Sequence, residues 1–139
     1  MNENLCLTIK NDQNELKLIN RSIRLFLKTL KHDKKIINSV NLILEEAITN
    51  IIKYAYEDDS RHQIVIELFI TDEVTKIKIT DDGKHFSGEY YELPEKRKSP
   101  DKMKIGGLGI HLIHSLSKKV KYERIDNKNI LSIEIETPL

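Results

Sequence analysis

The chain has 139 residues and a mass of 16.2 kDa, the size of one domain that buries enough surface to fold without disulfides or metals. Apolar residues make up 39% of the sequence and charged residues 32%, which is typical of a globular domain rather than a disordered chain. The formal net charge of +1 argues against binding to nucleic acid or to an anionic membrane surface. The one cysteine, Cys6, excludes an intramolecular disulfide framework and a cysteine zinc cluster.

The apolar runs of the sequence fall well short of the about 18 residues that a membrane-spanning helix needs. The start of the sequence contains neither a basic leader nor the long apolar segment of a secretion signal. We therefore expect a cytoplasmic protein whose single domain extends over residues 1–139.

The spacing of apolar residues predicts the secondary structure. Apolar residues that recur every three or four positions predict two long amphipathic helices, and Asp33 can cap the second of them. Alternation of apolar and polar residues predicts strands, and the short polar connection at residues 71–73 predicts a hairpin. The expected elements are a strand over 5–10, helices over 15–30 and 33–55, strands over 63–70 and 74–80, a short helix opened by residues 106–109, and strands over 119–125 and 129–136. This order predicts an α+β fold, a two-layer sandwich with helices on one face of a mixed, mainly antiparallel sheet.

One segment of the chain has no regular period. From residue 84 to about 105 the sequence is rich in charge, and it contains Pro94 and Pro100. All five glycines of the chain fall between positions 83 and 109, in or beside this segment. A segment of this length without structure of its own is typical of a lid, a binding loop or disorder.

A carboxylate and an amide lie one helical turn apart in the second predicted helix. Glu46 and Asn50 share one face of that helix, about 6 Å apart, among apolar neighbours. One interpretation is a solvated edge of the helix. The other is a polar cavity for a hydrated Mg²⁺, in which the protein supplies one oxygen ligand and waters and phosphates supply the rest.

Two aspartates and a glycine follow an apolar strand, at Asp81, Asp82 and Gly83. Asp-Gly is a favoured turn pair, so a simple turn would account for these residues. They equally suit an acidic side chain at the end of the sheet that accepts a hydrogen bond from an exocyclic amine such as that of adenine.

A glycine-rich turn precedes the short predicted helix, at Gly106, Gly107, Leu108 and Gly109. Bare backbone N–H groups and the helix N-terminus then face an anion such as phosphate. The sequence lacks the spacing and the Lys-Ser/Thr pair of a P-loop. A Rossmann fingerprint fails because its third glycine is missing and no βαβ crossover surrounds the motif. Basic residues just upstream could neutralise and cover a triphosphate: Lys96, Arg97, Lys98, Lys102 and Lys104.

Taken in order, these three segments resemble the N, G1 and G2 boxes of the ATP-binding domain shared by Hsp90-type chaperones, gyrase-type topoisomerases, MutL and histidine kinases. The strings that begin at Glu45 (EEAITN), Asp81 (DDGKHF) and Gly106 (GGLGIHLI) are similar to those of the small anti-sigma factor serine kinases of bacterial sporulation and general-stress switches. The resemblance covers nearly the whole chain and implies the fold of the histidine kinase-like (GHKL) ATPases.

The resemblance implies a role for each motif. Glu46 matches the general base that activates the attacking hydroxyl, and Asn50 matches the Mg²⁺ ligand. Asp81 matches the carboxylate that recognises adenine, with Gly83 allowing the backbone to approach the base. The phosphate-binding turn is matched by Gly107 and Gly109, with Gly106 and Leu108 in the same turn.

Two further positions bear on the resemblance. Lys53 lies where histidine kinases of this fold often place a phosphate-contacting base. Tyr54 stands where the anti-sigma kinases commonly carry histidine, and residues 84–105 lack the Thr-Lys-Pro-like lid motif of the sporulation branch. These departures concern lid contacts and the choice of substrate rather than nucleotide binding.

The resemblance implies a protein that binds ATP and Mg²⁺ and phosphorylates a serine or threonine of a small antagonist protein in a partner-switching system. Competition for a second partner such as a sigma factor is also implied, as is a homodimer. Histidine kinase activity is not expected, because 139 residues leave no space for a helical phospho-acceptor domain. The alternative is a nucleotide-sensing binding module with little or no kinase activity, and phosphorylation of a partner separates the two.

Overall fold

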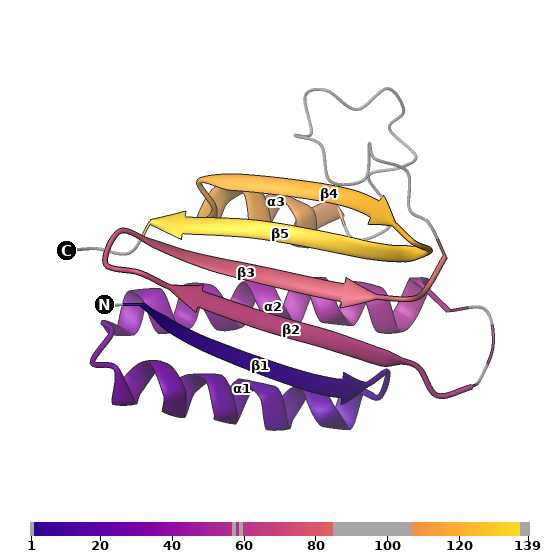
Figure 1. The fold of residues 1–139 in the computed structure, drawn as a ribbon, viewed down its shortest axis with the longest axis horizontal. Coiled ribbons are helices and arrows are strands. Elements are labelled where there is room, and N and C mark those ends of the chain that lie inside the picture. The colour runs from indigo at the N-terminus through magenta and orange to yellow at the C-terminus, as the bar shows by residue number, and fades with distance from the viewer. Residues whose placement is uncertain (1, 57, 59, 85–106, 137–139) are drawn as a thin grey trace.

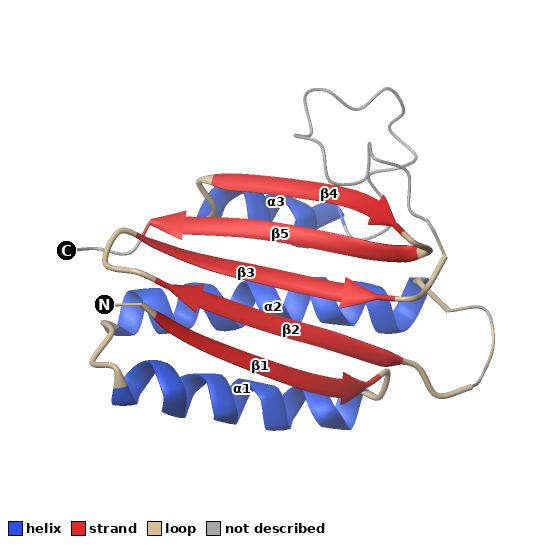
Figure 2. Ribbon diagram, viewed as in Figure 1, coloured by secondary structure: helices blue, strands red, loops and turns tan. Residues whose placement is uncertain are grey.

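The computed structural model describes residues 2–56, 58, 60–84 and 107–136. They form two layers, a sheet and three helices packed on one of its faces (Figure 1; Figure 2). The predicted α+β sandwich is thereby confirmed. In chain order the elements are β1 (Glu3–Lys10), α1 (Gln13–Thr29), α2 (Lys34–Tyr54), β2 (Gln63–Ile70), β3 (Val74–Asp81), α3 (Gly107–Leu116), β4 (Lys119–Ile125) and β5 (Lys128–Glu136).

The sheet has five strands in the order β1-β2-β3-β5-β4, and each neighbouring pair is antiparallel. β2 and β3 form the expected hairpin, as do β4 and β5. Because β5 lies between β3 and β4, Asn129 near the start of β5 is the register partner of Asp81 at the end of β3. Two residues that are 48 positions apart in the sequence therefore lie side by side.

Both long helices begin at an aspartate that caps the first turn. The Asp12 carboxylate accepts a hydrogen bond from the N–H of Asn14, and the Asp33 carboxylate accepts one from the N–H of Ile36, each at 2.9 Å. Such a cap satisfies one of the N–H groups that have no partner within the helix. The capping role predicted for Asp33 is confirmed.

The core lies between the helices and the inner face of the sheet, where alternate residues of β2, β3 and β5 are buried. Burying one large aliphatic side chain contributes about 1.5–3 kcal/mol, so α2, with buried residues along its whole length, is held firmly against the sheet. This packing sets the position of the polar residues that α2 carries. The fully buried core residues include Ile43, Leu44 and Ile48 of α2 and Ile64, Ile66, Leu68, Ile77 and Ile79 of the sheet.

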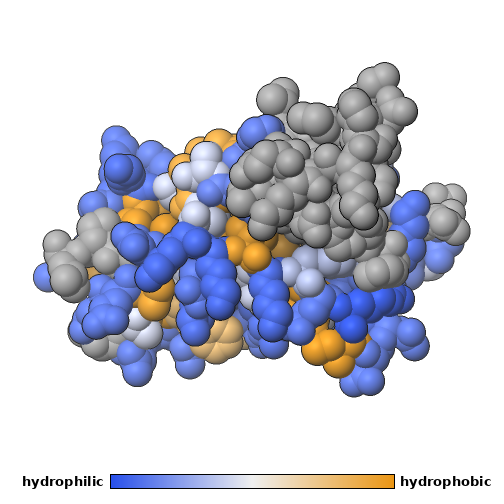
Figure 3. All heavy atoms as spheres, turned by 90° about the horizontal axis from the view of Figure 1, so that it is seen from above, coloured by the Kyte–Doolittle hydropathy of each residue, from blue (hydrophilic) through white to orange (hydrophobic). Residues whose placement is uncertain are grey.

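No helix in the described part of the chain is long and apolar enough to cross a membrane. The side of the molecule seen in Figure 3 is mostly hydrophilic, with apolar side chains in small separate patches. Scattered apolar side chains of this kind are ordinary on a protein surface. Among the described residues, the large apolar side chains that are exposed are Leu18, Leu25, Leu42, Phe69 and Ile125.

Candidate functional site

The motif segments meet at one end of the sheet, where β3 and α2 end and α3 begins (Figure 1). The N–H of Lys84 donates to the carbonyl oxygen of Ala55 at 2.8 Å, which joins the turn after β3 to the C-terminus of α2. Gly83 packs against the same alanine: a Cβ atom placed on Gly83 would lie 2.5 Å from the Ala55 Cβ and 2.6 Å from its carbonyl oxygen. Only a glycine allows this approach, so the turn is fixed against the helix.

Glu46 brings α2 into contact with the first turn of α3. Its side chain is partly buried, and a Cβ atom placed on Gly109 would collide with its Oε2 atom and lie 3.3 Å from its Cδ. The bare backbone of Gly109 therefore leaves the space that the Glu46 carboxylate occupies. A carboxylate and the N-terminal turn of a helix, whose N–H groups attract anions, are thus neighbours.

Asn50 lies one turn further along α2 and is only 5% exposed. Its Nδ2 atom is buried and has no hydrogen-bond partner among the described residues. A buried polar atom without a partner costs about 1–3 kcal/mol, so such atoms in native proteins are often explained by a ligand or an ion. The solvated helix edge that the sequence left open does not describe this side chain.

Asp81 ends β3 with a carboxylate that is 4% exposed. Its Oδ1 atom accepts hydrogen bonds from the N–H of Gly83 at 2.8 Å and from Nδ2 of Asn129 at 3.0 Å. Burial raises the pKa of Asp81, and these two hydrogen bonds act in the opposite direction. Within the described part of the chain no hydrogen bond involves Oδ2, so one acceptor atom of the carboxylate remains for a ligand.

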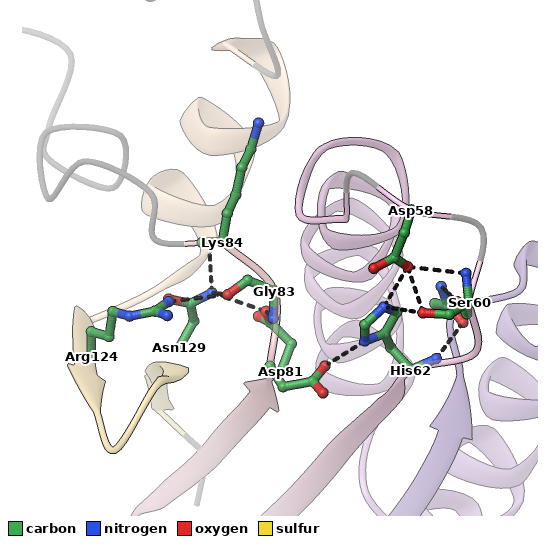
Figure 4. A network of polar contacts seen from close by, with 10 residues as sticks. Asp58, Ser60, His62, Asp81, Gly83, Lys84, Arg124 and Asn129 are labelled. Carbon is green, nitrogen blue, oxygen red and sulfur yellow. Dashed lines mark hydrogen bonds and ion pairs between the residues drawn. The ribbon is translucent and has the colours of Figure 1, made fainter.

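Asn129 supports the turn after β3 from the neighbouring strand (Figure 4). Besides Asp81, its Nδ2 atom donates to the carbonyl oxygens of Lys84 at 2.9 Å and Gly83 at 3.3 Å. The hydroxyl of Tyr122 donates to the Asn129 Oδ1 atom at 2.7 Å, which fixes the orientation of the amide.

Arg124 adds a charged donor to the same group. One nitrogen of its guanidinium donates to the Asn129 Oδ1 atom at 2.8 Å and to the carbonyl oxygen of Gly83 at 3.1 Å. Arg124, Asn129 and Tyr122 lie outside the three sequence motifs and were not predicted to belong to the site. A signal for Asn129 was present, because its position in the alternation of β5 faces the core, where a polar residue needs partners.

The remaining predicted residues are less closely joined to this group. Lys53 is exposed in the last turn of α2 and makes no ion pair with another described residue. Gly107 and Leu108 lie in the first turn of α3. Gly106 and the predicted lid, including its basic residues, lie outside the described residues, apart from Lys84.

The described residues fit an adenine nucleotide and a metal ion on three counts. Asp81 has an acceptor atom without a partner among the described residues, and the backbone at Gly83 carries no side chain. The unpartnered Nδ2 atom of Asn50 is a donor that suits a phosphate oxygen, whereas a metal ion would be held by the Oδ1 atom of the same amide. A carboxamide oxygen is among the ligands that Mg²⁺ prefers, usually with several waters retained.

The sequence profile of the histidine kinase-like ATPase domain matches residues 9–135. Because this match includes nearly the whole chain, the protein belongs to the family of histidine kinase-like ATPase domains. The family resemblance that the three motifs indicated is confirmed.

Curated relatives are serine-protein kinases. The chain is 32% identical over 92 residues to serine-protein kinase RsbW of Listeria monocytogenes serotype 4a, a match over 61% of this chain and 57% of the relative. It is 33% identical over 89 residues to serine-protein kinase RsbW of Staphylococcus aureus, over 60% of this chain and 56% of the relative. The matches thus span a little over half the length of these relatives.

Solved structures share the fold at lower sequence identity. The catalytic domain of the histidine kinase ThkA has a TM-score of 0.55 at 17% identity, over 94% of this chain and 96% of that one. A chain of the SiaB–SiaC complex from Pseudomonas aeruginosa has a TM-score of 0.56 at 15% identity, over 95% of this chain and 89% of that one. These likenesses confirm the fold that the resemblance implied.

Proposed function

We propose that this chain is a regulatory serine/threonine kinase that binds ATP with Mg²⁺ and phosphorylates a small antagonist protein. The observation that carries the proposal is the meeting of Glu46 on α2 with Gly109 on α3, one helical turn from the buried amide of Asn50. This proximity supports assigning the general base, the metal ligand and the phosphate site to one small region.

Recognition of the adenine ring is assigned to Asp81. Its Oδ2 atom, which has no partner among the described residues, accepts the hydrogen bond from the adenine amine, while Gly83 and Asn129 hold Oδ1. The absence of a side chain at Gly83 lets the flat base approach the backbone. Because these groups are held before any ligand arrives, little ordering is needed on binding.

The phosphates are assigned to the motif at the N-terminus of α3, made of Gly106, Gly107, Leu108 and Gly109, because the backbone N–H groups of a helix's first turn bind anions. Asn50 would hold the Mg²⁺, which neutralises negative charge on the phosphates when bound. Lys53, exposed one turn beyond Asn50, would add a positive charge at the same site.

Transfer is assigned to Glu46 as general base. It takes the proton of the partner's hydroxyl as the hydroxyl oxygen bonds to the γ-phosphorus and the bond to the leaving ADP oxygen breaks. Most of the remaining catalysis in phosphoryl transfer comes from positioning and charge neutralisation, so this small set of residues suffices.

A protein substrate is supported by the names of the curated relatives, which are serine-protein kinases. One solved neighbour is a chain in a two-protein complex, SiaB–SiaC. We propose a partner-switching system in which the chain acts in the cytoplasm, phosphorylates its antagonist and binds a second regulator such as a sigma factor, as a monomer or a homodimer.

The test uses the purified chain, ATP labelled at the γ-phosphate and candidate antagonist proteins from the same organism. We expect label on one serine or threonine of the antagonist, identified by mass spectrometry, and no label when Mg²⁺ is chelated. If the chain binds ATP but labels no partner, the nucleotide-sensing module replaces the kinase. If it binds no nucleotide, both functions are refuted.

A further inference from the structure

A second group of polar side chains, to which the function proposed above assigns no role, lies beside the turn after β3 (Figure 4). His62, just before β2, lies between the carboxylates of Asp58, in the same connection, and Asp82, just after β3. Its Nε2 atom is 2.8 Å from Asp58 Oδ1, and its Nδ1 atom is 3.1 Å from Asp82 Oδ1. Both ring nitrogens therefore face a carboxylate oxygen.

This geometry selects one protonation state of the imidazole. An ionised carboxylate only accepts hydrogen bonds, and a neutral imidazole has a single N–H to donate. Only the positively charged imidazolium can donate to Asp58 and Asp82 at once. The hydrogen bonds to Asp58 and then Asp82 raise the pKa of His62, while hydrogen bonds from Ser60 and His62 lower the pKa of Asp58 to about 2.

The other groups around the ring agree with a positive charge on it. Tyr56, just after α2, stacks on the imidazole with ring centroids 4.2 Å apart and an angle of 15° between the planes, a contact that favours a cation. The hydroxyl of Ser60 donates to Asp58 and lies 2.9 Å from Nε2 of His62, so it accepts from this N–H. That direction is opposite to the one in a serine nucleophile activated by histidine.

We propose that protonated His62 is a positioning residue for the nucleotide base, because it holds Asp82 and thereby the backbone between Asp81 and Gly83. The inference rests on the function proposed above, in which Asp81 and Gly83 contact adenine. Among the described residues, Tyr56 after α2, Asp58 in the same connection and Asp82 after β3 are the titratable groups that face the ring.

The histidine is itself anchored on its other side. Its N–H donates to the Oδ1 atom of Asn11 at 3.0 Å, and its carbonyl accepts from the N–H of Asn11 at 3.1 Å. His62 therefore joins the end of β1, through Asn11, to the turn after β3. Loss of the proton removes one of its two carboxylate bonds and loosens that link.

Nucleotide affinity is then expected to fall as the pH rises. Binding that needs the imidazolium weakens between the pKa of His62 in the free protein, which is raised above the ordinary value of about 6.5, and its higher pKa in the complex. We expect the dissociation constant to increase about fivefold over this window, the lower end of typical coupling between two sites.

The experiment is calorimetric titration of the full chain with ADP and Mg²⁺ at several pH values between about 6 and 9. His62→Gln cannot take up a proton, so we expect its profile to lack this increase. The nucleotide phosphates titrate alike with both proteins, and the comparison isolates the histidine. His32→Gln, in the connection at the other end of α2, is the matched control and should keep the wild-type profile.

A second measurement does not need the nucleotide. NMR titration of the imidazole should give a pKa above about 6.5 for His62, and Asp82→Asn should lower it. Parallel profiles for wild type and His62→Gln, or a His62 pKa at or below its ordinary value, would overturn the inference while nucleotide binding stands. No binding at any pH would refute the proposed function itself.

Discussion

At the scale of single residues, Asp81 makes the most specific prediction. With Oδ1 engaged by Gly83 and Asn129, the carboxylate can serve a ligand through Oδ2. Guanine carries an oxo group where adenine carries its amine, and two facing acceptors cost about 1–3 kcal/mol. We therefore expect ATP to bind about fivefold or more tightly than GTP, and Asp81→Asn to weaken ATP binding without unfolding the protein.

Isothermal titration calorimetry measures both affinities, and circular dichroism of Asp81→Asn checks that its fold is retained. Equal affinities of the parent protein for ATP and GTP would contradict the role given to Asp81.

Substitutions of Glu46 and Asn50 are predicted to affect ATP binding and phosphoryl transfer differently. Glu46→Ala removes the general base, so phosphoryl transfer should slow by roughly a hundredfold or more while ATP affinity is retained. Asn50→Ala removes the proposed metal ligand, so Mg²⁺-dependent affinity and transfer should fall together. Calorimetry and the γ-phosphate transfer assay, run side by side on both variants, separate the two roles.

Glu45→Ala is the matched control for this pair, because Glu45 is the exposed neighbour of Glu46 on the same helix. It should leave binding and transfer unchanged. Phosphoryl transfer by Glu46→Ala at the parent rate would contradict the assignment of Glu46 as the general base, and with it the proposed kinase mechanism.

At the scale of the element, the C-terminus of α1 carries a residue in an unfavourable conformation. Lys31 has a φ of 61°, while the N–H groups of Lys31 and His32 donate back to the carbonyls of Lys28 and Leu27. This is the Schellman pattern, in which the left-handed position usually holds glycine. Lys31→Gly relieves about 1–2 kcal/mol of backbone strain and makes the unfolded chain more flexible, so we expect a net gain of about 0.5–1 kcal/mol.

Urea unfolding measures this gain as a rise in the free energy of unfolding. Lys28→Gly, three residues earlier and inside the helix, is the contrasting control and should lose about 1 kcal/mol. A loss of stability in Lys31→Gly would contradict this account of the helix end.

At the scale of the whole molecule, Asn129 joins β5, β3 and the turn that follows β3. Asn129→Ala would leave buried acceptors without a donor, so we expect the free energy of unfolding to fall by about 1–3 kcal/mol. It also removes a hydrogen bond that lowers the pKa of Asp81, so that pKa should rise further. The unfolded chains titrate alike, so the loss should grow as the pH rises from the raised pKa of Asp81 in the wild type to the higher pKa in the variant.

Urea unfolding at several pH values tests this dependence. Ser132→Ala, on the opposite face of β5, is the matched control and should change stability by less than about 0.5 kcal/mol at any pH. A loss in Asn129→Ala that is the same at acid and neutral pH would show that Asn129 does not act through the Asp81 carboxylate.

The sequence by itself determined the elements of this protein and the faces they bury. Period-two and three-to-four-residue spacing are local properties of the chain, and a cap such as Asp33 acts within one helical turn. The same locality explains why Glu46 and Asn50, one turn apart on α2, were found as a pair. Their motif, together with those at Asp81 and Gly109, was sufficient to indicate the family.

Only the tertiary structure decided which side chains support those motifs. Asn129 contacts Asp81 from 48 positions away, and His62 contacts Asp82 from 20 positions away. These contacts depend on the strand order β1-β2-β3-β5-β4 and its register, which bring together the end of β3, the start of β5 and the α2–β2 connection. Apolar periodicity states which face of a strand is buried, but it carries no information about which strand lies beside it.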